Sequence, residues 1–178
     1  MTSFTMRIAF GALAGAAGTV AMDLVWYGRY RRSGGEDGPL AWEFAGSVDS
    51  FEQASAPGQV GKRLADTVGI ELRDSAAATT TNAMHWLTGA GYGVAHALLL
   101  HERPTLLGGV ATGVGAVANS YATLGAMGIY QPIWRYDTAT LVKDVSAHVV
   151  FGLATSLAYR TLSGARGGAT RRGLVRRR

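Results

Sequence analysis

Apolar residues gather into four long segments that polar connections separate. We predict membrane spans at residues 8–27, 83–100, 106–129 and 141–162. The third contains no charged side chain, and about 24 such residues are enough to cross a hydrocarbon core of roughly 30 Å. The pattern therefore predicts an all-α polytopic membrane protein. Its fold would be an up-down bundle of about four transmembrane helices that forms a single domain over residues 1–165.

The first apolar segment also fits a second interpretation. Arg7, the apolar stretch after it and the small residues around Gly18 are compatible with a secretory signal. The segment runs for about 20 residues and ends in Trp26, Tyr27 and Arg29, which is typical of an anchor at the membrane–water interface. With three further spans behind it, an uncleaved helix is favoured.

One long polar loop, residues 31–81, connects the first two predicted spans. Pro57 stands where a helix can begin, and Val60, Leu64 and Val68 follow at i, i+4 and i+8. Such an apolar stripe on a short helix is typical of a segment lying on the bilayer surface. A loop helix packed against its own bundle would show the same stripe, so both alternatives stay open.

Basic residues are distributed unevenly around the spans. One side carries Arg7, Arg103, Arg160 and the basic tail Arg166–Arg178, which outnumber the basic residues near the span ends on the other side. The positive-inside rule therefore predicts a multi-pass protein of the inner (plasma) membrane with both termini in the cytoplasm. The tail is expected to contact anionic lipid. No nucleic-acid partner is expected, because no nucleic-acid-binding motif accompanies the tail.

Composition adds an argument about helix packing. The chain has 25 glycines and no cysteine, which excludes disulfides and thiolate chemistry within this sequence. Glycine costs about 1 kcal/mol relative to alanine in soluble helices, whereas small residues let membrane helices approach closely and also favour homo-oligomers. The glycines expected to pack helices are Gly11, Gly15, Gly18, Gly89, Gly93, Gly109, Gly113 and Gly152.

Two spacings recur along the chain and indicate two helical hairpins of the same topological sense. The repeated pairs are Gly11-x-x-x-Gly15 with Gly109-x-x-x-Gly113, and His85-x-x-x-Gly89 with His148-x-x-x-Gly152.

The expected topology concentrates polar residues on one membrane face. In an up-down bundle, the ends of spans one and three share a face with the starts of spans two and four. Ionisable residues at membrane depth are costly and usually face the bundle interior. We therefore expect a polar pocket on the long-loop side, where a buried Asp23 would need His85 or His148 as its partner. The candidate pocket residues are Asp23, His85, Asn119, Asp144 and His148.

Several chemistries fit these residues. Asp144 and His148 are four apart and share a helix face, so the carboxylate can orient the imidazole. His85 and His96 are eleven apart and return to nearly the same angle on a helix. His85, His96 and His148 could hydrogen-bond between helices, handle protons, or ligate haem or a divalent metal. No HExxH spacing is present, so no cofactor is predicted and haem or metal is the alternative.

The segment from His85 to Tyr159 carries a recognisable order of motifs. A span opening with His85-Trp86 is followed by a glycine-rich span, an aromatic connection with Pro132, and Ala147-His148-Val149-Val150-Phe151-Gly152. This order resembles the YagU-type family of uncharacterised bacterial inner-membrane proteins. The resemblance implies four spans, no established enzymatic activity, no agreed catalytic residues and a link to acid-stress survival. His148 and Gly152 match the histidine-glycine signature of the family's last span.

The sequence thus predicts a small integral membrane protein of the bacterial envelope without established catalytic activity. In this hypothesis His85, His148 and Asp144 fix helix packing and respond to pH. Two alternatives from other classes remain: a histidine-ligated haem or metal-binding membrane redox module, and a small channel or transporter subunit that oligomerises through its glycine faces.

Overall fold

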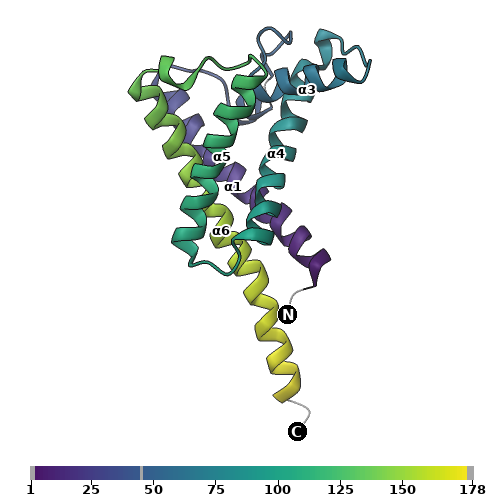
Figure 1. Ribbon diagram of the computed structural model, residues 1–178, viewed down its shortest axis with the longest axis vertical. Coiled ribbons are helices and arrows are strands. Elements are labelled where there is room, and N and C mark those ends of the chain that lie inside the picture. The colour runs from purple at the N-terminus through teal and green to yellow at the C-terminus, as the bar shows by residue number, and fades with distance from the viewer. Residues whose placement is uncertain (1–2, 45, 176–178) are drawn as a thin grey trace. The chain divides into compact units, whose positions relative to one another are not determined.

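Helices make up all the regular structure in the part of the chain that is described. The computed structural model covers residues 3–44 and 46–175, with side chains described through residue 164. The elements are α1 (Phe4–Arg32), α2 (Pro39–Glu43), α3 (Ala56–Thr67), the 3-10 helix η1 (Asp74–Ala76), α4 (Ala77–Leu99), α5 (Thr105–Ala126), the 3-10 helix η2 (Ile133–Arg135) and α6 (Thr138–Val175) (Figure 1).

Two helices are long and apolar enough to cross a membrane. They are α1, Phe4–Arg32, and the Thr138–Gly164 part of α6. Helices α4 and α5 occupy the positions of the other two predicted spans. The expected all-helical fold is therefore present. Within the described residues, two of the four predicted spans are long and apolar enough to cross a membrane.

The start of α4 and the end of α6 differ from the bounds of the predicted spans. Helix α4 begins at Ala77 rather than at 83, so the predicted loop 31–81 is shorter and contains α2, α3 and η1. Helix α6 continues past 162 into the predicted basic tail, as far as Val175, because no proline interrupts it. The tail's side chains and residues 176–178 lie outside the described residues, so the lipid contact expected there stays a prediction.

Glycines in the left-handed region follow the ends of α3 and α5, as Gly34 with φ +94° follows that of α1. Gly69 has φ +77° after α3, and Gly128 has φ +65° after α5. In both cases a later backbone N–H returns to the last helical turn, from Ile70 to the Ala65 carbonyl at 2.9 Å and from Ile129 to the Leu124 carbonyl at 2.9 Å. This is the Schellman arrangement, and it satisfies carbonyls that the helix end would leave unpaired.

The chain divides into two compact units. Unit 1 comprises Met1–Met22, Gly89–Ala116 and Val145–Arg178, and unit 2 comprises Asp23–Thr88 and Val117–Asp144.

Small residues form the interior of unit 1. Ala14 and Ala97 are fully buried beside Tyr159, and the largest fully buried side chains are threonines, Thr19 and Thr155. A Cβ added at any of the eight glycines expected to pack helices would come within 3.0 Å of an atom of a neighbouring helix. Backbone packed against backbone is what glycine permits and any larger side chain prevents.

The two glycine-packed hairpins in unit 1 are offset by one helical turn. In the hairpin of α1 and α4, Gly89 lies against Gly15 and Thr19. In the hairpin of α5 and α6, its sequence counterpart Gly152 lies against Gly109 and Gly113. The counterparts of Gly15 and Thr19 would be Gly113 and Val117, so the second hairpin is shifted along its axis by four residues.

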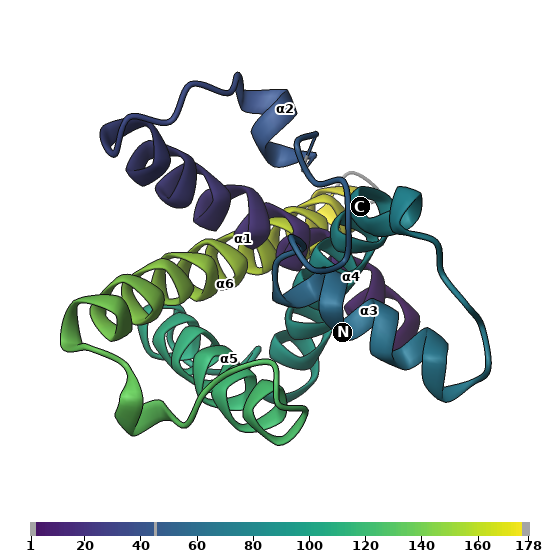
Figure 2. The same cartoon turned by 90° about the horizontal axis from the view of Figure 1, so that it is seen from above.

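Unit 2 holds the connecting elements. The short α2 lies beside the C-terminal turns of α1 (Figure 2), where the Trp42 ring packs 5.4 Å from that of Tyr27. Helix α3 crosses the N-terminal turns of α4, and its Gly58 and Gly61 face Thr81 and Thr80 there. Helix α3 therefore packs on α4 through its glycine face, while Leu64 and Val68 of the predicted apolar stripe are exposed.

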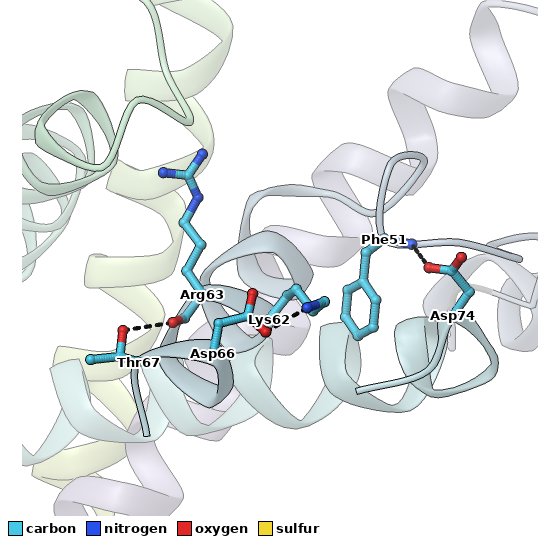
Figure 3. Close-up of polar contacts among 6 residues, drawn as sticks. All are labelled: Phe51, Lys62, Arg63, Asp66, Thr67 and Asp74. Carbon is cyan, nitrogen blue, oxygen red and sulfur yellow. Dashed lines mark hydrogen bonds and ion pairs between the residues drawn. The ribbon is translucent and has the colours of Figure 1, made fainter. Parts of the chain in front are cut away.

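A small satellite core holds the loop between α2 and α4. It consists of Phe51, Ala54 and Ala77. The backbone N–H of Phe51 donates to the Asp74 carboxylate over 3.1 Å, which fixes the loop above this core (Figure 3).

Candidate functional site

A buried carboxylate–imidazole pair lies in unit 2. Asp23, in the C-terminal half of α1, is only 7% exposed. The Nε2 atom of His85, on α4, lies 3.0 Å from one Asp23 oxygen and 3.1 Å from the other. An ionised carboxylate only accepts hydrogen bonds, so the Nε2–H of His85 is the donor to both oxygens. Of the two partners expected for a buried Asp23, the structure has His85.

A second carboxylate, Glu43, faces the same pair. Glu43 ends α2, and α2 is held in place by the packing of Trp42 on α1. One oxygen of Glu43, Oε1, is buried and accepts no hydrogen bond in the described part of the chain. An unsatisfied buried oxygen is costly, and more so when the group is charged. The site therefore disfavours the ionised form of Glu43.

Electrostatics agree with this geometry. Burial, followed by the negative charge of Asp23, raises the pKa of Glu43 above its ordinary value of 4.5, while His85 and the Trp86 side chain act in the opposite direction. The Trp86 ring also makes an edge contact with the His85 ring at a centroid distance of 6.3 Å. Helices α1, α2 and α4 thus bring two carboxylates, one imidazole and one indole together.

This arrangement can bind and release protons. Glu43 and His85 interact electrostatically, so the charge on each changes the proton affinity of the other. Proton uptake is the chemistry that these contacts support.

A second polar bridge in unit 2 joins α5 to α6. The Tyr121 hydroxyl donates to Asp144 over 2.5 Å, and Tyr121 is 9% exposed. The rings of Tyr130 and Tyr136 pack against Tyr121 at 5.3 and 5.2 Å. Burial and the charge of Asp144 raise the pKa of Tyr130, which lies in the connection between the helices. The three phenols and the carboxylate close this end of the α5–α6 hairpin.

His96 has a separate environment, in unit 1. It is 3% exposed, and its Nδ1 lies 2.7 Å from the Thr112 hydroxyl. That hydroxyl donates to the Gly108 carbonyl over 2.8 Å, so it accepts from His96 and fixes the proton on Nδ1. The ring edge also meets Tyr159 at 5.9 Å. His96 hydrogen-bonds between helices here, and only its Nε2 would be open to ligation.

The other predicted pocket residues lie in different surroundings. Asn119 is exposed on α5, where its carbonyl accepts from the Thr123 hydroxyl. Asp144 has Tyr121 as a partner, which the Asp144–His148 spacing did not suggest. His148 belongs to unit 1, where its carbonyl lies over Gly113.

Among the residues that the structure describes, no group of three or more His, Asp or Glu side chains is arranged to hold a metal ion. The Nε2 of His85 faces Asp23, so ligation through that atom would require the pair to separate.

Comparison with known proteins gives no match: no family, no curated protein and no solved structure is significantly similar to this chain. The resemblance to the YagU-type family accordingly stays a prediction.

Sequence reasoning missed Glu43 altogether. The signal that could have found it is an acidic residue inside an aromatic stretch, between Trp42 and Phe44 and shortly after Pro39. A short helix starting at that proline would present such a carboxylate toward the bundle.

Proposed function

We propose that this chain is an integral membrane protein that responds to pH through a proton-binding cluster formed by Asp23, His85 and Glu43. The observation that carries the proposal is the buried Asp23 carboxylate, held by His85 through both oxygens at 3.0 and 3.1 Å, with Glu43 facing it. No catalytic step is assigned to the protein.

Membrane embedding is supported by where the large side chains lie. A soluble domain buries most of its Leu, Val and Phe side chains and leaves mainly charged and polar residues outside. Here the buried hydrophobic residues are mostly alanines, and Leu24, Leu87 and Leu107 are all more than half exposed. A bilayer around the helices would cover such side chains, and packing through small residues is how membrane helices associate.

We extend the two candidate spans to four, with α4 and α5 crossing as well. Each is a continuous helix of more than 20 residues without an acidic or basic side chain other than histidine. The positive-inside rule then places Arg7, Arg103 and Arg160 on the cytoplasmic side of an inner membrane, together with both termini. The loop between α1 and α4 would face the opposite compartment.

The cluster would act as a switch on α2. Above the pKa of Glu43, two carboxylates repel one another across a partly buried site, which weakens the docking of α2. Protonation of Glu43 removes that repulsion. The loop that carries α2 would therefore pack more tightly at low pH.

Trp86 gives a direct test. Its ring contacts His85 and its side chain interacts with Glu43, so its emission should report the protonation of the cluster. We would subtract the emission of Trp86→Phe from that of the wild type in detergent between about pH 4 and pH 8. The difference signal should show a titration that Glu43→Gln and His85→Gln each alter, and that the double variant abolishes.

His101→Gln is the matched control, because His101 belongs to unit 1 and should leave the signal unchanged. A difference signal that does not vary with pH, or one that titrates identically in the double variant, would refute the proton-binding role.

A further inference from the structure

Two connections in unit 2 leave from the same end of its helices. Helix α1 ends at Arg32 and α4 begins at Ala77, while α5 ends at Ala126 and α6 begins at Thr138. The loop with α3 and the connection with η2 therefore both lie where these helices stop (Figure 1). If the helices cross a bilayer, this is the level of the membrane–water boundary.

Helix α3 buries its glycine face and exposes its large apolar residues, which is the reverse of the usual arrangement in a soluble protein. Its glycines, Gly58 and Gly61, are buried against α4. Its large apolar residues point elsewhere: Leu64 is 51% exposed, Val68 is 70% exposed, and Ile70, just past the helix, is 54% exposed. The apolar stripe seen in the sequence is thus not the face that meets the bundle.

The connection between α5 and α6 shows the same feature. Trp134, in η2, is 81% exposed, and Arg135 follows it. Tryptophan next to a basic residue is typical of the headgroup level, where the ring is partly in the acyl region and the cation remains in contact with water and phosphate.

A contact joins these two connections. The Arg63 guanidinium, on α3, donates to the backbone carbonyl of Met127, just after α5. The other charges of α3 are paired, since Lys62 and Asp66 form an ion pair at 2.5 Å, and Figure 3 shows this pair beside Arg63 on the helix. With its charges paired, the helix offers little to a charged protein partner and presents mainly its aliphatic residues.

We propose that α3 and the α5–α6 connection form an interfacial collar, whose apolar residues insert into a lipid bilayer between headgroups and acyl chains. The collar residues are Leu64, Val68, Ile70 and Trp134. The proposal rests on the membrane embedding proposed above and is independent of the proton-binding cluster. It assigns the long loop to the lipid surface rather than to a soluble partner, because an amphipathic helix with an outward aliphatic face binds that boundary.

Spin labels on single cysteines can test the collar, since the chain has no cysteine of its own. The full protein would be placed in phosphatidylcholine–phosphatidylglycerol vesicles, labelled singly at Val68 or Ile70. Reference labels would be at Val114, an exposed position within α5, and at Glu52, an exposed position in the loop. Collision with oxygen reports the acyl region, and collision with a nickel chelate reports water.

We expect the oxygen-to-nickel ratio at Val68 and Ile70 to be several-fold higher than at Glu52 and to approach that at Val114. Labels at Val68 and Ile70 that behave like Glu52, with Val114 rich in oxygen, would overturn the collar and leave membrane embedding intact. Labels shielded from both reagents would also overturn it, in favour of a protein or a second copy on this face. A water-exposed Val114 would overturn the collar and the membrane embedding together.

Discussion

The imidazole of His85 bridges both oxygens of the Asp23 carboxylate, although the two residues lie 62 positions apart in the chain. The pair fixes the relative position of α1 and α4 within unit 2. It also gives the buried Asp23 carboxylate a partner, since an unpartnered buried charge would be costly.

This pair should stabilise the protein measurably. We expect a double-mutant cycle with Asp23→Asn and His85→Gln to give a coupling free energy of about 1.5–3 kcal/mol, because a hydrogen bond to a buried charged group is worth that much. The free energy of unfolding would be measured in mixed micelles.

The surface pair Lys62–Asp66 provides the control for that cycle. Both of its side chains are more exposed than Asp23, so Lys62→Ala and Asp66→Ala should show a coupling of under about 1 kcal/mol. A coupling no larger at Asp23–His85 than at Lys62–Asp66 would contradict the assignment.

Glu43→Gln should stabilise the protein at neutral pH. The pKa of Glu43 is raised by burial and by Asp23, so the folded state binds the proton more tightly than the unfolded state does. Its stabilising contribution is complete below about the ordinary value of 4.5 and is lost as the pH rises through the folded-state value. Glutamine cannot ionise and avoids this loss.

Thermal unfolding at several pH values measures the effect. The melting temperature of Glu43→Gln should match the wild type near about pH 4 and exceed it near about pH 7. Glu52→Gln, at an exposed position in the same loop, should track the wild type throughout. A Glu43→Gln variant that loses stability as pH rises, as the wild type does, would count against the raised pKa.

Two glycines on α4 should respond oppositely to alanine. A Cβ at Gly89 would collide with the Thr19 side chain, whereas a Cβ at Gly91 meets nothing within 4 Å. We expect Gly89→Ala to cost about 1–3 kcal/mol through overpacking. Gly91→Ala should be neutral or stabilising by up to about 1 kcal/mol, through helix propensity. Unfolding in mixed micelles distinguishes the two, and equal effects would refute close packing at Gly89.

Asp137 should contribute to stability through the first turn of α6. Its carboxylate accepts from the Thr140 hydroxyl at 2.7 Å and from the Thr140 N–H at 2.9 Å, the geometry of a helix N-cap. These hydrogen bonds lower the pKa of Asp137 below its ordinary value of 3.8. The stabilisation is therefore present above about that value and disappears as the pH falls through the lower folded-state pKa.

Asp137→Ala should accordingly lower the melting temperature at neutral pH, and the difference from the wild type should shrink in strong acid. Asp137→Asn keeps one acceptor oxygen and should lose less. If alanine and asparagine behave alike at neutral pH, the side chain does not cap the helix.

Much of the fold follows from local patterns in the sequence. Apolar runs placed the long helices, and the glycine spacings named residues that lie backbone to backbone in unit 1. Both are properties of one helix and its immediate neighbour. Topology limited the partner of a buried Asp23 to His85 or His148, because that needed only the order and direction of the helices, and the structure has His85.

The remaining contacts of the candidate site depend on how the helices and loops are positioned along one another. The hydrophobic pattern of a single helix does not determine this. Glu43 reaches its site through the packing of Trp42 on Tyr27, a contact between a loop and a helix end. Tyr121, across the hairpin, donates to Asp144 a hydrogen bond that the spacing of Asp144 and His148 did not predict. A shift of one turn between helices decides such partners and leaves the hydrophobic pattern of each helix unchanged.

The one-turn offset between the hairpins has a chemical consequence. Tyr121 follows Gly113 by eight residues, as Asp23 follows Gly15, and Asp144 precedes His148 by four. Tyr121 thus occupies in the second hairpin the position that Asp23 occupies in the first, and Asp144 lies one turn before the counterpart of His85. The acceptor carboxylate is on the first helix of one hairpin, α1, and on the second helix of the other, α6. One bridge contains an imidazole, which can change charge near neutrality, and the other a phenol, which does not. Two hairpins of similar sequence spacing thus carry bridges with different donors. In acid the imidazole donor can gain a positive charge, whereas the phenol donor stays neutral, so the two hairpins would respond differently to pH.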